Sequence, residues 1–153
     1  MMTSGANVDE GPSVDLVAEQ AAAKAVVDMW LQVWETKDMA LFDRIFSHDP
    51  DMIIFGTDEA EYWVGYEMAR KSVEHQLGVF GDTEGTVRNQ VVKVHASGEV
   101  AWFTEMMDMG VTSGGERMNL TIWFSGVLEK RAGTWTFVQF HASVPVAGQA
   151  IEY

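Results

Sequence analysis

The final run of alternating residues, from Trp135 to Ser143, constrains the fold of this chain and its candidate site more than any other segment. Side chains of an extended strand alternate in direction, so the odd positions of the run share one face. That face would carry Trp135, Phe137, Gln139, His141 and Ser143, which combines aromatic rings with three polar groups. A mostly apolar pocket needs such a combination, whereas an ordinary core excludes unpaired polar groups.

The first half of the chain predicts three helices. Apolar residues recur at helical spacing over about residues 13–37, which indicates a long amphipathic helix with Ser13 as its N-cap. Asp38 is expected to cap a second, short helix that ends before Asp49-Pro50. Apolar residues at helical spacing over 69–80 indicate a third helix.

Strands account for the remainder. Two short β-type runs, over 51–55 and 62–64, predict a hairpin between the second and third helices. Longer strand-like runs, divided by turn residues, lie near 86–96, 99–111, 116–130 and 134–145. Helices followed by an antiparallel meander predict an α+β fold, with a curved antiparallel β-sheet wrapped on about three N-terminal helices.

Length and composition indicate one domain. A chain of 153 residues that is 47% hydrophobic is long enough for a single core. We expect a flexible tail over residues 1–12, because this segment is polar and lacks periodicity, a single domain over 13–147 and a C-terminal tail over 148–153. No cysteine is present, which excludes disulfides and thiolate metal sites.

The charge of the chain bears on its partners. The formal net charge is -13, and such a chain repels nucleic-acid backbones and anionic membrane surfaces. We therefore expect neither nucleic acid nor a membrane as a partner. The polar, acidic first residues lack a signal-peptide pattern, so a cytoplasmic location is expected.

Short motifs support a family resemblance. They are Gly56-Thr57-Asp58, Glu61, Trp63, Gly65, Val127-Leu128-Glu129-Lys130, Gly133, Trp135 and His141-Ala142-Ser143. In order and spacing, over roughly residues 17–146, the chain resembles the SnoaL-like branch of the nuclear-transport-factor-like superfamily, which includes the ketosteroid isomerases. The resemblance implies a cone-shaped barrel with an internal cavity. Relatives include isomerases, polyketide cyclases, dehydratases, epoxide hydrolases and pure binding domains, so the fold alone does not decide function.

The run from residue 117 to 129 suggests which face lines that cavity. Its odd positions, such as Asn119 and Trp123, are polar or amphipathic, and its even positions are apolar. We assign the odd face to the cavity because it shares the mixed character of Gln139 and His141. The even face would then form an outer apolar patch through which the chain forms a homodimer. The patch comprises Leu120, Ile122, Phe124, Val138 and Phe140.

The expected occupant is a small apolar molecule, uncharged or weakly polar. Aromatic side chains would line the cavity, and a few polar ones would orient the ligand. The candidate ligand-binding residues are Trp30, Trp34, Phe55, Trp63, Asn119, Trp123, Gln139, His141 and Ser143.

Catalysis is the alternative function. His141 could serve as a general base, or it could be a buried histidine satisfied by its neighbours. Glu61 or Glu105 could supply a carboxylate for a cofactor-independent isomerase, cyclase, dehydratase or hydrolase acting by proton transfer. An inward carboxylate within hydrogen-bond reach of His141, or of a shared water, would favour the enzyme, whereas a His141 that meets only hydroxyls and amides would favour binding. No cofactor is expected, and the scattered histidines predict no metal site.

Overall fold

The computed structural model describes residues 13–149 and 151 of the chain. The predicted N-terminal tail, residues 1–12, and part of the C-terminal one lie outside the described residues. Three helices and six strands occur in this part of the chain. In order they are α1 (Leu16–Thr36), α2 (Met39–Ile45), β1 (Ile53–Phe55), β2 (Tyr62–Val64), α3 (Tyr66–Val79), β3 (Thr83–Val94), β4 (Val100–Ser113), β5 (Glu116–Arg131) and β6 (Thr134–Ser143).

Side-chain caps begin the first two helices. Asp15, rather than Ser13, caps α1, because its carboxylate accepts a hydrogen bond of 3.1 Å from the backbone N–H of Ala18. Asp38 caps α2 as predicted. Lys37, between the two helices, has a φ of 58°, a left-handed conformation that ends α1. No helix in the described ranges is long and apolar enough to cross a membrane.

All six strands form one curved sheet in the order β2-β1-β6-β5-β4-β3. The α+β class is confirmed, but the sheet differs from the predicted barrel in two respects. It is mixed, because β1 runs parallel to β6 while the other neighbours are antiparallel. It is also open, because β2 and β3 are edges that do not pair with each other.

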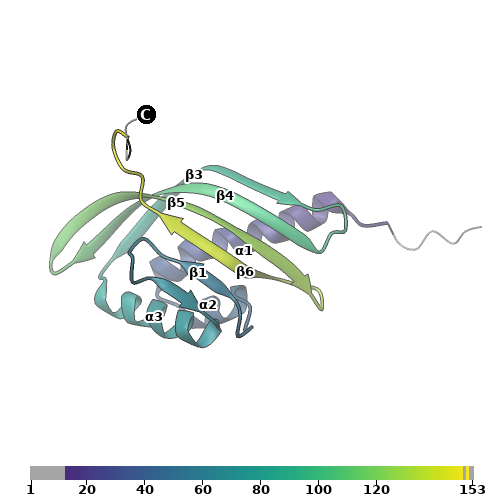
Figure 1. Cartoon of the computed structure of the whole chain (residues 1–153), viewed down its shortest axis with the longest axis horizontal. Helices are drawn as coiled ribbons and strands as arrows, with labels where there is room; N and C mark the ends of the chain where they lie inside the picture. Colours follow the sequence, from purple (N-terminus) through teal and green to yellow (C-terminus); the bar gives the residue numbers. More distant parts are fainter. Residues whose placement is uncertain (1–12, 150, 152–153) are drawn as a thin grey trace, which may run out of the picture.

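The helices cover one face of the sheet, which we call the inner face. Figure 1 shows β3 to β6 curving over α1, with α2 and α3 on the same side next to β1. Polar contacts fix α1 to the sheet: the Lys130 ammonium and the Trp135 indole N–H both donate to the Glu19 carboxylate, at 2.5 and 2.9 Å. The opposite, outer face of the sheet carries no element of the described chain.

A tight turn sets the register of the two longest strands. Ser113 pairs with Glu116 across a two-residue loop, Gly114-Gly115, whose φ angles are 58° and 84°. Both angles are positive, which glycine adopts without strain and which matches the twist of a hairpin. With this register, odd residues of β4 pair with even residues of β5, so both sets share one face.

A β-bulge divides β6 into two halves. Leu128 pairs with Phe137 but Val127 pairs with Gln139, which leaves Val138 as the extra residue. An extra residue reverses the alternation of side chains. Trp135 and Phe137 therefore point inward, whereas Gln139 and His141 point outward. The predicted single face from residue 135 to 143 was wrong for this reason.

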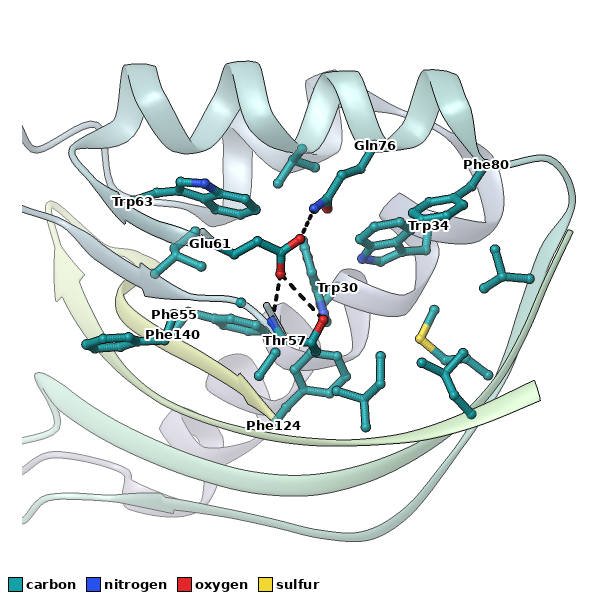
Figure 2. Close-up of a pocket in the computed structure, with 18 of the residues that line it drawn as sticks. Trp30, Trp34, Phe55, Thr57, Glu61, Trp63, Gln76, Phe80, Phe124 and Phe140 are labelled. Atoms are coloured by element: carbon teal, nitrogen blue, oxygen red, sulfur yellow. Dashed lines mark hydrogen bonds between the residues drawn. The ribbon is translucent and has the colours of Figure 1, made fainter. Parts of the chain in front are cut away.

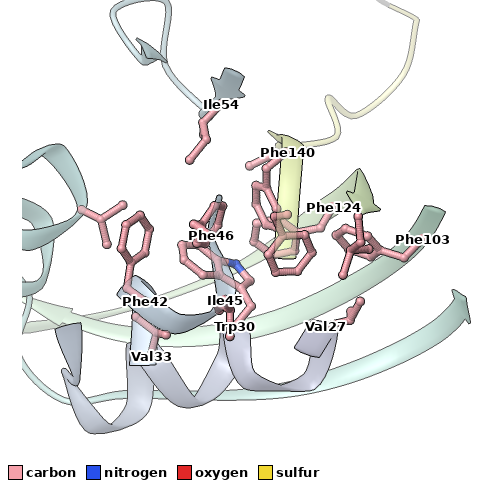
Figure 3. Packing of buried hydrophobic residues seen from close by; sticks show 14 of the residues in the cluster. Val27, Trp30, Val33, Phe42, Ile45, Phe46, Ile54, Phe103, Phe124 and Phe140 are labelled. Carbon is pink, nitrogen blue, oxygen red and sulfur yellow. The ribbon is translucent and has the colours of Figure 1, made fainter. Parts of the chain in front are cut away.

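The core lies between α1, α2 and the inner face of the sheet (Figure 3). Trp30 is at its centre and meets the rings of Phe46, Phe124 and Phe140 edge-on, with centroids 5.6, 6.3 and 5.0 Å apart. Phe103 and Phe137 extend this cluster along the sheet. Edge-to-face contacts of this kind add to the free energy of burial.

The predicted outer patch faces the interior. Phe124 and Phe140 are buried in the core, and Leu120 and Ile122 pack against it. Homodimer formation stays a prediction, which sedimentation velocity would test. The outer face available to a second copy instead carries the half-exposed rings of Trp102 and Trp123.

Gly126 offers a test of the inward packing of β5. A Cβ atom at this position would lie 2.5 Å from the Gln139 carbonyl oxygen and 2.9 Å from the Phe103 ring. We expect Gly126→Ala to lower the free energy of unfolding by about 2 kcal/mol, measured by urea denaturation. Gly78→Ala is the control, because nothing lies within 4 Å of a Cβ there, and it should stabilise α3 by about 0.5 kcal/mol. Equal effects would contradict this packing.

Candidate functional site

A cavity of about 170 Å³ opens between α1, α3 and the inner face of the sheet (Figure 2). Its wall is mostly apolar. It is lined by Trp30, Trp34, Ile54, Phe55, Gly56, Thr57, Glu61, Trp63, Val73, Gln76, Phe80, Met109, Val111, Met118, Leu120, Ile122, Phe124, Phe140 and Ala142. An apolar hollow with few polar groups has the composition of a small-molecule site.

Glu61 is the one ionisable side chain among the described residues that line the cavity. Its Oε2 accepts hydrogen bonds from the backbone N–H groups of Thr57 and Asp58, at 2.7 and 3.2 Å. Its Oε1 accepts from the Gln76 amide at 2.6 Å (Figure 2). Donors from the β1–β2 loop and from α3 thus fix the carboxylate in one orientation.

Two buried polar groups beside the cavity have no partner among the described residues. The indole nitrogens of Trp30 and Trp34 are buried and donate to no acceptor within the described chain. Both residues lie on α1, one turn apart, with ring centroids 5.7 Å from each other and planes at 89°. Buried polar groups are normally satisfied, so these two unpaired nitrogens, which are shielded from solvent, lower the stability of the folded state.

The predicted ligand-binding residues fall into two groups. Trp30, Trp34 and Trp63 line the cavity. Phe55 also borders it, but its ring lies with those of Tyr62 and His141, the residues with which it pairs in the sheet. Their role in binding a ligand stays a prediction.

The second group lies on the other side of the sheet. Asn119, Trp123 and His141 are exposed there, and Gln139 and Ser143 share that face. The assignment of the odd face of β5 to the cavity was therefore wrong. The even face lines the cavity, because the hairpin register pairs it with the apolar odd residues of β4.

The outward residues still cluster. Trp123, His141 and Ser143 border a shallow hollow on the outer face, together with Asn89 from β3. The nearest aromatic contact of His141 is the Phe55 ring, at a centroid distance of 5.5 Å. Within the described residues, no carboxylate hydrogen-bonds to His141. Glu105 borders the same hollow, and proton transfer through His141 stays a prediction.

Glu105 points inward but does not reach the cavity. Only 3% of it is exposed, and it lies under α1, where Gln90 donates to its Oε2 at 2.9 Å while Oε1 has no partner in the described chain. Gln90 also donates to Asp28 on α1, at 2.8 Å. Burial first, and the nearby Asp28 charge second, raise the pKa of Glu105 to about 7, although the Gln90 hydrogen bond and Lys24 oppose the shift.

Several residues that line the cavity are not predicted from the sequence to do so. Leu120, Ile122, Phe124 and Phe140, which are predicted for the outer patch, line the cavity instead, as do Met109 and Gln76. The two-residue Gly114-Gly115 turn indicates the inward position of the strand residues, because it fixes the pairing of β4 with β5. Gln76 lies on a helix far from the Glu61 loop in sequence, and no local pattern marks that contact.

Acidic and histidine side chains do not gather in a metal-binding group anywhere in residues 13–149 or at 151.

Comparison with protein families identifies the domain type. The model of the SnoaL-like domain matches residues 23–147, which covers most of the chain. No curated protein matches the sequence.

Solved structures share the fold. A nuclear transport factor 2-like superfamily protein from Salmonella enterica serovar Typhimurium superposes with a TM-score of 0.79 and 16% identity, over 90% of this chain and 99% of that one. An NTF2-like protein of unknown function from Pseudomonas putida superposes with a TM-score of 0.72 and 15% identity, over 84% of this chain and 88% of that one. A hexachlorocyclohexane dehydrochlorinase, LinA type 2, superposes with a TM-score of 0.72 and 15% identity, over 90% of this chain and 95% of that one. At such identities the likeness extends to the fold alone.

The buried Glu105 predicts a pH dependence of stability. Its pKa is about 7 in the folded protein and near 4.5 when unfolded, so the folded state binds the extra proton between these values. This contribution to stability is present in full below about pH 4.5 and is lost as the pH rises through 7.

Glu105→Gln keeps the shape and removes the charge, which makes it the matched control. Urea denaturation of both proteins from pH 5 to 9 should give nearly equal free energies of unfolding at pH 5. At pH 9 the variant should be more stable by about 2 to 3 kcal/mol. A difference that does not change with pH would contradict this account of Glu105.

Proposed function

This chain belongs to the SnoaL-like domain family, and we propose that it binds a small, largely apolar molecule in the cavity between α1, α3 and the inner face of the sheet. The observation that carries the proposal is the cavity itself, whose lining is apolar or aromatic except for Glu61, Thr57 and Gln76. Transfer of apolar ligand surface from water into such a wall is favourable without any reaction.

Cavity size limits the occupant. An engineered protein cavity of about 150 Å³ holds benzene, and the cavity here has about 170 Å³. A molecule of one ring, or of two small rings, therefore fits without movement of the wall. The flexible side chains of Met109 and Met118 at the wall allow some adjustment for a larger ligand.

Charge excludes anionic ligands. The described lining residues include no Lys, Arg or His, while Glu61 contributes a carboxylate. An anion would lose its hydration and meet a like charge, so affinity for it should be low. A neutral ligand matches the wall.

Proton-transfer catalysis is the second candidate, and one observation favours it. The Glu61 carboxylate lies in the cavity wall, held by three N–H donors, with an Oε1 that accepts only from Gln76. A fixed carboxylate beside a bound ligand could abstract a proton from it. The LinA relative is named as a dehydrochlorinase, but the likeness at 15% identity extends to the fold alone. Conversion of a bound compound by the protein, abolished in Glu61→Gln, would favour this function.

The binding proposal is tested by narrowing the cavity. Calorimetric titration with a panel of neutral one-ring and two-ring compounds should identify a ligand. We expect Ile122→Phe to weaken its binding by about ten-fold or more, because the larger ring occupies space in the cavity.

Two control variants separate the faces of the sheet. Val127→Phe adds the same kind of ring to the outer face of β5, and His141→Ala removes the imidazole from the outer face of β6. Both should leave the affinity unchanged. Loss of binding in the controls, with Ile122→Phe unaffected, would reject the cavity as the site.

A further inference from the structure

We infer that the cavity selects small neutral molecules that carry one hydroxyl group, which donates a hydrogen bond to Oε1 of Glu61. The inference rests on the proposed function and narrows the apolar ligand to a one-ring alcohol.

A glycine allows the Glu61 carboxylate to lie against the β1–β2 loop. A Cβ atom at Gly56 would lie 2.1 Å from Oε2 of Glu61, so a larger residue there would displace the carboxylate. The backbone of the loop is closed as well, because the Gly56 N–H donates to the Glu61 carbonyl at 2.7 Å and the Glu61 N–H donates to the Asp58 carbonyl at 3.0 Å. The carboxylate is therefore fixed before a ligand arrives, which lowers the entropic cost of binding.

The two oxygen atoms of this carboxylate differ in the number of donors that they meet. Oε2 accepts from the Thr57 and Asp58 backbone at 2.7 and 3.2 Å, and from the Thr57 hydroxyl at 3.4 Å. Among the described residues, only the Gln76 amide donates to Oε1, at 2.6 Å. An ionised carboxylate has about four lone-pair positions, two on each oxygen. Oε1 therefore keeps one acceptor position that the described chain does not use.

This position belongs to the cavity. Glu61 and Gln76 both line it, and Figure 2 shows the carboxylate among the lining side chains, with Gln76 reaching it from α3. Glu61 is only half-buried, so its carboxylate stays accessible. A hydrocarbon in the cavity would cover Oε1 without supplying a donor, which removes hydration from a charged oxygen without compensation.

The donor that suits this position is a hydroxyl group rather than an ammonium group. An ammonium group carries three N–H donors, and its charge makes transfer out of water costly. Apart from Glu61, the described lining residues offer side-chain oxygen atoms only on Thr57 and Gln76. A hydroxyl has one donor, which Oε1 satisfies alone, and a hydrogen bond to a charged acceptor is stronger than one between neutral groups.

Three probes of one shape isolate the donor. Benzyl alcohol, ethylbenzene and benzylamine differ only in a terminal hydroxyl, methyl or ammonium group, and ligand-observed NMR titration gives their affinities. We expect the wild-type protein to bind benzyl alcohol about ten-fold more tightly than benzylamine. The ratio of the affinities for benzyl alcohol and ethylbenzene is the main readout, because the cost of removing water from the hydroxyl is the same in every variant.

Glu61→Gln tests the acceptor. The Thr57 and Asp58 N–H groups require an oxygen at the Oε2 position, so the glutamine amide places its NH₂ group where Oε1 lies in the wild-type protein. The ratio should fall by about ten-fold, because the ligand hydroxyl then meets a neutral donor instead of a charged acceptor.

Glu59→Gln is the matched control. It removes the same charge from the same loop, but Glu59 is exposed and does not line the cavity. The ratio should not change in this variant.

A second readout uses the wild-type protein and does not depend on a variant that folds. In a crystal structure of the benzyl alcohol complex, the ligand oxygen should lie about 2.7 Å from Oε1 of Glu61. A hydroxyl that faces away from Oε1 would overturn the inference, as would an ordered water that occupies this position in the complex.

The outcomes separate this inference from the proposal beneath it. An unchanged ratio in Glu61→Gln, with ethylbenzene still bound, would overturn the role of Glu61 and leave an unselective apolar cavity. Tighter binding of benzylamine than of benzyl alcohol would overturn the choice of a hydroxyl. Binding of none of the three probes to the wild-type protein at millimolar concentration would overturn both the inference and the proposed function.

Discussion

The pairing of β4 with β5 decides which side chains form the cavity, and the Gly114-Gly115 turn decides that pairing. Both glycines have positive φ angles, 58° and 84°, and the two-residue loop joins Ser113 to Glu116. A slip of one residue would exchange the two faces of β5. Leu120 and Ile122 would then point outward, and the cavity would be lined with polar side chains. The site proposed here exists only in the observed register.

Bulges in the neighbouring strands adapt the sheet to the helices beneath it. At Val138 the bulge turns Phe140 and Ala142 inward to the cavity after Phe137 has entered the core. In β3 the irregularity after Arg88 brings the Gln90 side chain to Glu105 and α1. The first bulge shapes an apolar wall and the second satisfies part of a buried carboxyl group. Each bulge locally reverses which side chains of the strand point toward the helices.

The sequence predicts the helices and strands correctly, but it does not predict which face of each strand points inward. Helical periodicity, the Asp38 cap and the turn residues predicted the three helices and four long strands to within a few residues. The face of β5 was misassigned because both of its faces contain large side chains, and the mixed run after Trp135 suggested one continuous surface. The Gly114-Gly115 turn indicates the correct face, because a two-residue loop pairs the even positions of β5 with the apolar odd positions of β4. The Glu61–Gln76 contact and the unpaired indoles arise from tertiary packing, which no periodicity reports.

The central claim is that a ligand occupies the inner, even face of β5. The most direct test is a set of intermolecular nuclear Overhauser effects between a bound probe and methyl groups of the isotope-labelled protein. The account predicts contacts with the methyl groups of Leu120, Ile122 and Val111, which line the cavity. It predicts none with Val127 or Val91, which lie on the outer face. Contacts confined to the outer methyl groups would contradict the account.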